Sequence, residues 1–158
     1  MTFMKRSFLL LLLMIVTVIT KAAPAADYGK VVPVPDKIVL NAKGGAYALS
    51  ASTGIYYTAG NADMERNAQF LAQYIKDMTK LSLAPSAVKG KAKGGISLVL
   101  NAKAKLAPEA YVLTVDKKGV TITGKTAAGV FYGIQTLRKA LPVLQSAETV
   151  ELPAARVE

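Results

Sequence analysis

Hydrophobic and polar residues alternate with a two-residue period between residues 111 and 123. Residues 111–115 read Tyr-Val-Leu-Thr-Val, a pattern typical of a strand whose two faces have different surroundings. The following residues, 116–119, read Asp-Lys-Lys-Gly and favour a turn, because glycine tolerates positive φ. Residues 120–123 then resume the alternation and should return antiparallel. The pattern predicts a β-hairpin.

Two other stretches have the period of an α-helix. The first covers residues 63–80, with Asn61 or Asp63 as the N-cap. Its apolar residues recur at spacings of three and four: Met64, Ala68, Leu71, Ile75 and Met78. The second follows Gly124, with Thr126 as the N-cap, and ends at Pro142. Its apolar stripe comprises Val130, Ile134, Leu137 and Leu141. Each stripe is expected to pack on a sheet.

Short β-type runs make up most of the remaining pattern. They cover residues 37–40, 46–50, 55–58, 96–100 and 149–152, with a further short strand possible at 81–83. Residues 85–95 are rich in Lys, Gly and Ala without any period, which indicates a mobile loop. We therefore expect an α+β domain: a mostly antiparallel sheet with two helices packed on one face.

The N-terminal residues have the pattern of a secretory signal peptide at 1–25. Lys5 and Arg6 precede an apolar run over residues 8–19, and small residues follow, so cleavage could occur after Ala22 or Ala25. A membrane-spanning helix would need about 20 apolar residues, and this run is too short. We expect an exported protein, periplasmic or extracellular, with no membrane association after cleavage. Its parts would be an extended segment at 26–36, the α+β domain at 37–145, and a strand or linker at 146–158.

The chain is basic, with 20 Lys and Arg against 10 Asp and Glu. Three of the basic residues belong to the predicted leader, which leaves 17 against 10 and a charge of +7. The excess is spread over three loops: Lys89, Lys91 and Lys93; Lys103 and Lys105; Lys117 and Lys118. Such loops could attract phosphates or acidic polymers. Solvated, solubilising loops are the better interpretation, because no aromatic residue for base stacking is interleaved, and no nucleic-acid partner is expected.

No catalytic apparatus is visible in the residues. Histidine and cysteine are absent, which removes the usual metal ligands, general base and thiol nucleophile, and no cofactor is expected. The ten carboxylates are scattered among expected caps, turns and termini, with no pair suggesting a cleft. They are Asp27, Asp36, Asp63, Glu65, Asp77, Glu109, Asp116, Glu148, Glu151 and Glu158.

Three smaller features each have two interpretations. Residues 119–126 satisfy the phosphate-loop pattern G-x-x-x-x-G-K-[ST], but the intervening Val-Thr-Ile-Thr favours a straight strand, and we expect no nucleotide. Tyr47, Tyr56 and Tyr57 could form a sugar-stacking platform or be ordinary half-buried strand residues. Gly129 and Gly133 could let the second helix approach the sheet closely or contact a ligand, and we favour the close approach.

Residues 111–115, 119–123 and 128–138 closely resemble the non-catalytic N-terminal domain of family 20 glycoside hydrolases, the β-N-acetylhexosaminidases. The Val-Pro-Val-Pro sequence at 32–35 resembles the proline-marked start of that domain. Residues 152–158 resemble the segment that leads into the family's catalytic barrel. The resemblance covers about residues 30–158 and implies a small α+β domain, in agreement with the fold expected from the pattern.

The resemblance also implies where the family's chemistry resides. An adjacent Asp-Glu pair in a TIM barrel does the catalysis: Glu protonates the leaving oxygen, and Asp orients the substrate's own 2-acetamido group. No position of this sequence corresponds to that pair. The leading hypothesis is a truncated or split family member, an accessory domain that is inactive without its partner barrel. The alternative is an exported carbohydrate-binding or interaction module that uses the tyrosine-bearing face or the sheet.

Overall fold

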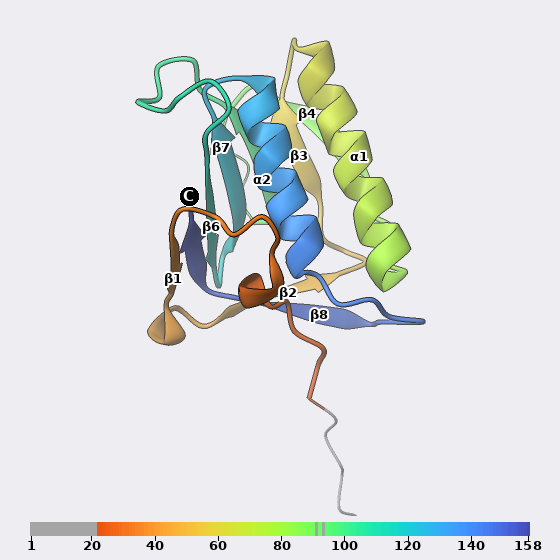
Figure 1. Ribbon diagram of the computed structural model, residues 1–158. Helices are drawn as coiled ribbons and strands as arrows, with labels where there is room; N and C mark the ends of the chain where they lie inside the picture. Colours follow the sequence, from red (N-terminus) through yellow and green to blue (C-terminus); the bar gives the residue numbers. More distant parts are fainter. Residues whose placement is uncertain (1–21, 91, 93) are drawn as a thin grey trace, which may run out of the picture.

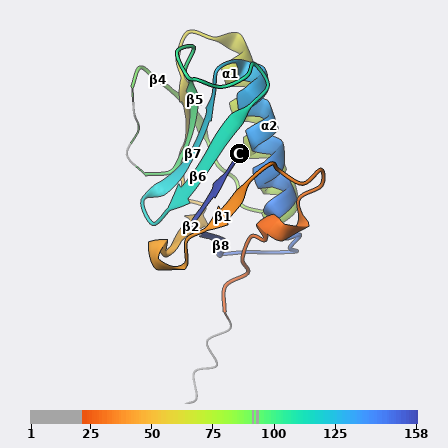
Figure 2. The same cartoon turned by 60° about the vertical axis from the view of Figure 1, so that its left-hand side comes forward.

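The computed structural model describes residues 22–90, 92 and 94–158 (Figure 1). Most of the predicted leader at 1–25 therefore lies outside the described residues, as do Lys91 and Lys93. One sheet forms a layer that is covered on one face by two helices, as the turned view also shows (Figure 2). The helices are α1 (Ala62–Thr79) and α2 (Ala127–Ala140). The prediction of an α+β domain with two helices is confirmed.

The large sheet has seven strands in the order β1-β9-β6-β7-β5-β3-β4. Their bounds are β1 (Ile38–Leu40), β3 (Ile55–Thr58), β4 (Pro85–Val88), β5 (Ile96–Leu100), β6 (Tyr111–Asp116), β7 (Gly119–Gly124) and β9 (Ala155–Val157). Strands β2 (Ala46–Ser50) and β8 (Thr149–Pro153) pair with each other in a separate two-stranded sheet. The predicted hairpin is present as β6 and β7, with Asp116 paired to Gly119 at its turn.

The prediction of a mostly antiparallel sheet is wrong, because the sheet is mixed. Strands β1, β9, β6 and β7 pair antiparallel, whereas β7, β5, β3 and β4 pair parallel. The physical reason is the connection between β3 and β4. Helix α1 lies between them in the chain and carries it back across the sheet, so β4 starts again at the same end as β3. A tight turn would have produced an antiparallel pair.

Strand β4 lies within residues 85–95, which the sequence predicts to be a mobile loop, so that prediction is wrong for residues 85–88. Pro85 has no N–H to donate, and proline is tolerated in a sheet at an edge strand, which is the position that β4 occupies. The tentative strand at 81–83 is not formed. Leu81 and Leu83 are buried in the core, so their apolar character reflects packing and not a strand.

The sequence predicts that the segment 26–36 is extended. The structure differs in part, because the segment contains a 3₁₀ turn, η1 (Tyr28–Lys30). Asp27 caps this turn by accepting a hydrogen bond from the Gly29 N–H at 2.9 Å. The side chain of Tyr28 is buried, and its hydroxyl donates to the Pro153 carbonyl at 3.3 Å. Burial raises the pKa of the Tyr28 hydroxyl above its usual range. These contacts hold the N-terminal segment against β8.

Pairing between strands gives the large sheet two chemically different faces. On the face under the helices, Ile55 lies beside Ile96 and Ile96 beside Val120, and all three are buried. One residue further along, Tyr56 lies beside Ser97 and Ser97 beside Thr121 on the opposite face. The apolar core therefore fills the space between sheet and helices. The helix-free face is rich in hydroxyl groups.

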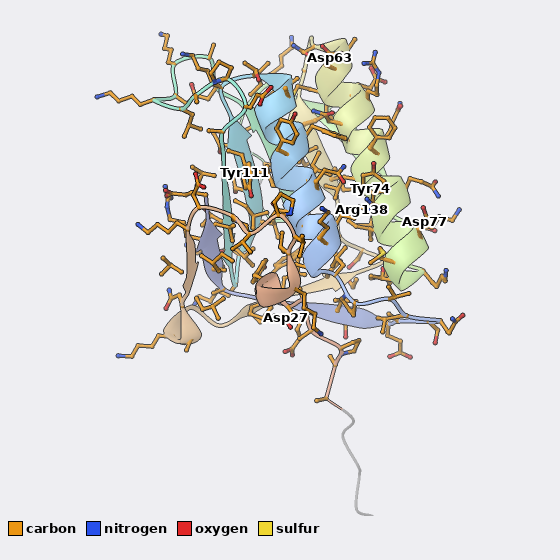
Figure 3. The ribbon with its side chains drawn as sticks, in the orientation of Figure 1. Asp27, Asp63, Tyr74, Asp77, Tyr111 and Arg138 are labelled. Carbon is orange, nitrogen blue, oxygen red and sulfur yellow. The ribbon has the colours of Figure 1, made fainter. Side chains whose placement is uncertain are left out.

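Helix α2 makes close contacts at its two interior glycines. A Cβ atom at Gly129 would lie 2.4 Å from the Ala110 carbonyl oxygen, and one at Gly133 would lie 2.4 Å from Ile122 Cγ2. The favoured interpretation, close approach of helix to sheet, is confirmed for Gly133, whereas Gly129 approaches the segment that precedes β6. Beside this contact, the hydroxyls of Tyr111 and Thr136 share a hydrogen bond of 2.6 Å, which joins β6 to α2 (Figure 3 labels Tyr111).

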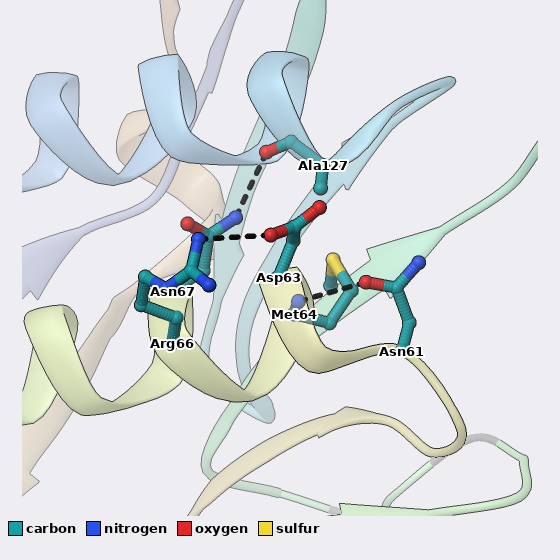
Figure 4. Close-up of polar contacts among 6 residues, drawn as sticks. All are labelled: Asn61, Asp63, Met64, Arg66, Asn67 and Ala127. Carbon is teal, nitrogen blue, oxygen red and sulfur yellow. Dashed lines mark hydrogen bonds and ion pairs between the residues drawn. The ribbon is translucent and has the colours of Figure 1, made fainter.

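The helix starts follow from their capping residues. The Asn61 side chain accepts from the Met64 N–H at 3.0 Å, and Thr126 accepts from the Gly129 N–H at 3.2 Å, so both predicted caps are confirmed. The Asn67 amide reaches from α1 to the Ala127 carbonyl at 2.8 Å and ties the two helix starts together (Figure 4). Within the described part of the chain, neither helix combines the length and apolar character that crossing a membrane requires.

Candidate functional site

Several of the described carboxylates make local structural contacts. Asp63 pairs with Arg66 at 2.9 Å in the first turn of α1, and Asp77 accepts from Gln73 (Figure 3 labels Asp63 and Asp77). Asp116 closes the hairpin turn by accepting from the Lys118 N–H at 2.6 Å. Among the described residues, no three His, Cys, Asp or Glu side chains gather closely enough to hold a metal ion.

The phosphate-loop pattern at 119–126 does not form a loop. Its first six residues are strand β7, paired with both β5 and β6. The backbone N–H groups of a paired strand alternate in direction and bond to the neighbouring strands, so they cannot converge on one phosphate. The interpretation of these residues as a strand is confirmed.

The three tyrosines considered as a sugar-stacking platform do not share a face. Tyr47 lies in the two-stranded sheet, where its hydroxyl donates to Thr53. Tyr57 is aligned with Leu98 on the helix-covered face and packs against the core. Tyr56 alone of the three lies on the helix-free face of the large sheet, where it lines a groove. A platform of three tyrosines is therefore wrong.

Four aromatic side chains form a row across the outer surface of the helix pair, named here the helix-face aromatic cluster. It comprises Phe70 and Tyr74 of α1 with Phe131 and Tyr132 of α2. Successive ring centroids are 6.2, 6.0 and 6.3 Å apart along the row. Phe70 is 41% exposed and Tyr132 is 42% exposed. These separations are within the range of favourable aromatic pairs, so the cluster is an ordered surface.

Polar contacts from α2 fix one end of this cluster. The Arg138 guanidinium lies over the Tyr74 ring, 4.6 Å from its centroid, as a cation–π contact (Figure 3). Gln135 donates to the Tyr74 hydroxyl at 3.3 Å and accepts from Arg138 at 3.3 Å. The cluster is not predicted by the sequence pattern, although Phe70 and Tyr74 are four residues apart and therefore share one helix face.

A groove of about 820 Å³ continues the apolar surface beyond Tyr132. The proline-marked segment forms its other side, where Val32 is 69% exposed and Val34 is 75% exposed. The Lys139 ammonium donates to the Val32 carbonyl and holds this segment near α2. At the groove wall, burial raises the pKa of Tyr111, the hydrogen bond with Thr136 opposes the rise, and the nearby Asp36 charge adds to it. Tyr132 belongs both to the aromatic cluster and to this groove, whose lining combines apolar residues with the charged residues Asp36, Glu109, Lys139 and Glu158.

Exposed aromatic and aliphatic residues that lie side by side in this way are typical of surfaces that another domain or protein covers. The fold that carries them is a helix-backed α+β domain. Residues 29–158 match the family model described as glycosyl hydrolase family 20, domain 2. The chain therefore belongs to glycosyl hydrolase family 20.

Comparisons with individual proteins agree with this assignment. The chain is similar to the β-hexosaminidase of Porphyromonas gingivalis (strain ATCC BAA-308 / W83), with 31% identity over 132 residues, which is 82% of this chain and 16% of that protein. The solved β-N-acetylhexosaminidase of Streptomyces coelicolor A3(2) is 28% identical with a TM-score of 0.66, covering 84% of this chain and 26% of that one. The Streptomyces plicatus enzyme is 27% identical with a TM-score of 0.68, covering 83% and 26%.

The chain thus spans about a sixth to a quarter of the length of these relatives. The relatives carry this domain in the same polypeptide as the catalytic domain, and the catalytic barrel is not covered by this chain.

Proposed function

We propose that this chain is the accessory N-terminal domain of an exported β-N-acetylhexosaminidase, a family member that removes terminal N-acetylhexosamine from glycans. The match of residues 29–158 to domain 2 of the family carries this proposal. The domain would act beside a catalytic barrel, supplied in the same chain, as in the relatives, or by a separate chain. Without that barrel it should not hydrolyse hexosaminides.

The helix-face aromatic cluster and the groove beside it are the surface proposed to meet the barrel. Phe70, Tyr132, Val32 and Val34 expose ring and aliphatic atoms that would be removed from water in such a contact. Aromatic side chains dominate the energetics of contacts between domains and proteins, because each buries a large area. The cation–π contact of Arg138 with Tyr74 keeps the rings ordered, which reduces the entropy lost on docking.

A hydrolysis assay tests whether the chain alone cleaves hexosaminides. The purified chain, shown to be folded by circular dichroism, is incubated with p-nitrophenyl N-acetylglucosaminide and compared with a buffer blank. We expect no release of nitrophenol above the blank. Turnover that copurifies with this chain through successive columns would refute the proposal of an accessory domain.

Docking is tested in a chimaera in which residues 29–158 replace domain 2 of the Streptomyces coelicolor enzyme. Phe70→Ser combined with Tyr132→Ser should reduce the activity of the chimaera. It should also lower the melting temperature of the chimaera by more than that of the isolated domain, which loses only the contacts among the rings. Val39→Ser is the matched control, because Val39 is similarly exposed, at 45%, but lies on the helix-free face. Equal effects of the two variants would contradict docking through the helices.

Export is proposed from the leader pattern at residues 1–25. The protein recovered from the periplasm or the medium should have lost its leader, with cleavage after Ala22 or Ala25. Intact-mass spectrometry of the secreted and cell-associated fractions measures this. Recovery of the uncleaved chain in the cytoplasm alone would rule the localisation out.

A further inference from the structure

The helix-free face of the large sheet is hollowed by a groove of about 780 Å³. Its floor is the parallel part of the sheet, strands β3, β5 and β7, and one wall includes Val88, Lys89 and Gly90. The side chains on the floor include Tyr56, Ser97, Thr121 and Thr123. Strand pairing places Tyr56, Ser97 and Thr121 in one row across the three strands. The row is a property of the backbone register and does not depend on a flexible loop.

Two glycines leave room for the Tyr56 ring. A Cβ atom at Gly54 would lie 2.6 Å from Tyr56 Cζ, and one at Gly95 would lie 2.8 Å from Tyr56 Cε2. Both distances are too short for real side chains, so the ring occupies space that is open only because these positions are glycine.

The hydroxyl groups beside the ring are available to a ligand. The Thr58 hydroxyl is already engaged, because it accepts from the Leu100 N–H at 3.1 Å. Ser97, Thr121 and Thr123 make no such side-chain hydrogen bond within the described part of the chain, where no buried side-chain polar atom lacks a partner. Their hydroxyls must therefore face solvent, and they do so within the groove. Each can donate one hydrogen bond and accept others.

The lining side chains indicate the chemistry of the ligand. Lys89 brings a positive charge to the wall, whereas the floor side chains Tyr56, Ser97, Thr121 and Thr123 are uncharged. An added peptide strand would pair with a sheet edge and not with a sheet face. An aromatic ring with a row of hydroxyls and the Asn101 amide matches a neutral molecule that has both apolar ring faces and many hydroxyl groups. Sugars have this combination.

We propose that this groove binds an oligosaccharide, with one sugar ring stacked on Tyr56 and its hydroxyl or acetamido groups hydrogen-bonded to Ser97, Thr121 and Thr123. The choice of an N-acetylhexosamine chain rests on the proposed function, whereas the choice of a neutral sugar rests on the groove itself. The domain would then retain the glycan on its helix-free face, on the side of the sheet opposite the proposed docking surface.

The test is isothermal titration of the purified chain with chitohexaose, the β-linked hexamer of N-acetylglucosamine. We expect saturable binding, weakened about tenfold or more by Tyr56→Ala, the scale of one aromatic contact, and retained by Tyr56→Phe. Thr121→Val keeps the side-chain shape and removes one hydroxyl, so it should also weaken binding. Thr149→Val, which makes the same exchange in the two-stranded sheet, is the matched control and should leave binding unchanged.

Three outcomes would overturn the proposal: no binding at any accessible ligand concentration, binding that survives both Tyr56→Ala and Thr121→Val, or binding abolished by raising NaCl from about 0.05 to about 0.5 M. The last result would assign any interaction to the lysine-bearing loops. Thr121→Val keeps the test valid if Tyr56→Ala disturbs the sheet. A lack of glycan binding would not change the result expected for the chimaera. The two experiments therefore test the glycan groove and the accessory role separately.

Discussion

Gly133→Ala tests whether the contact between α2 and the sheet sets the stability of the domain. At an exposed helix position this change would stabilise by about 1 kcal/mol, because alanine has the higher helix propensity. Here the new Cβ would lie 2.4 Å from Ile122 Cγ2 and 3.1 Å from Tyr111 Cδ2. Overpacking of this kind costs about 1–3 kcal/mol. Gly133→Ala should therefore destabilise the domain. We expect the free energy of unfolding to fall by about 1 kcal/mol, with about 2 kcal/mol as the upper value.

A second substitution tests whether contact with Ile122 causes this loss of stability. Ile122→Leu removes the Cγ2 methyl that the new Cβ would meet, while keeping the volume of the side chain, and by itself should cost less than about 1.5 kcal/mol. If the clash is the cause, the double variant should be more stable than the sum of the two single changes predicts, by about 1 kcal/mol. Gly90→Ala is the control, because no atom lies within 4 Å of its Cβ position. It should stabilise by about 0.4–1 kcal/mol through the unfolded state.

Guanidinium unfolding measures these free energies. The chain has seven tyrosines and no tryptophan, so tyrosine fluorescence and circular dichroism are the signals. The midpoints should order as Gly90→Ala above wild type and Gly133→Ala below it, with similar slopes. If Gly133→Ala stabilises the protein as much as Gly90→Ala does, or if Ile122→Leu fails to relieve its effect, then the helix is not held at the distance described.

Three further predictions concern single side chains. Tyr28→Phe should flatten the loss of stability at high pH: burial raises the pKa of Tyr28 in the folded state, so its stabilisation is fully present below about pH 10 and is lost as the pH rises through the raised value. Urea unfolding at a series of alkaline pH values measures this, and an unchanged slope would contradict it. Thr126→Ala should cost about 1 kcal/mol through the lost N-cap, whereas Thr126→Ser should cost much less. Asn67→Ala should cost about 1–2 kcal/mol because the half-buried hydrogen bond from α1 to the Ala127 carbonyl and the packing of the Asn67 side chain are lost. Asp63→Ala, which breaks an exposed ion pair nearby, should change stability by less than about 1 kcal/mol, and equal losses for the last two variants would refute the distinction.

The sequence predicts the local elements because their causes are local. The hairpin of β6 and β7 follows from alternation and from a turn closed by Asp116, and both helix starts follow from capping residues that bond within their own first turn. The parallel pairings could not be predicted in the same way. They depend on where α1 returns the chain. In addition, β4 reads Pro-Ser-Ala-Val and has too few apolar side chains to show the pattern of a strand.

The candidate surfaces, too, depend on contacts between distant residues and could not be predicted from local sequence patterns. Alternation in the sequence separates Tyr56 from Tyr57, but only the parallel register between β3, β5 and β7 places Tyr56 in a row with Ser97 and Thr121. The helix-face aromatic cluster has a helical spacing that could equally belong to a buried stripe. Its exposure depends on which side of each helix the sheet takes, and this is decided by packing between distant residues.

The position of β9 has a consequence for how the protein is made. This strand lies between β1 and β6 in the sheet, although it follows every other strand in the chain. During synthesis, β1 leaves the ribosome early and must wait for a neighbour until Val157 has emerged. Until then the sheet lacks the strand through which β1 is joined to the rest of the domain.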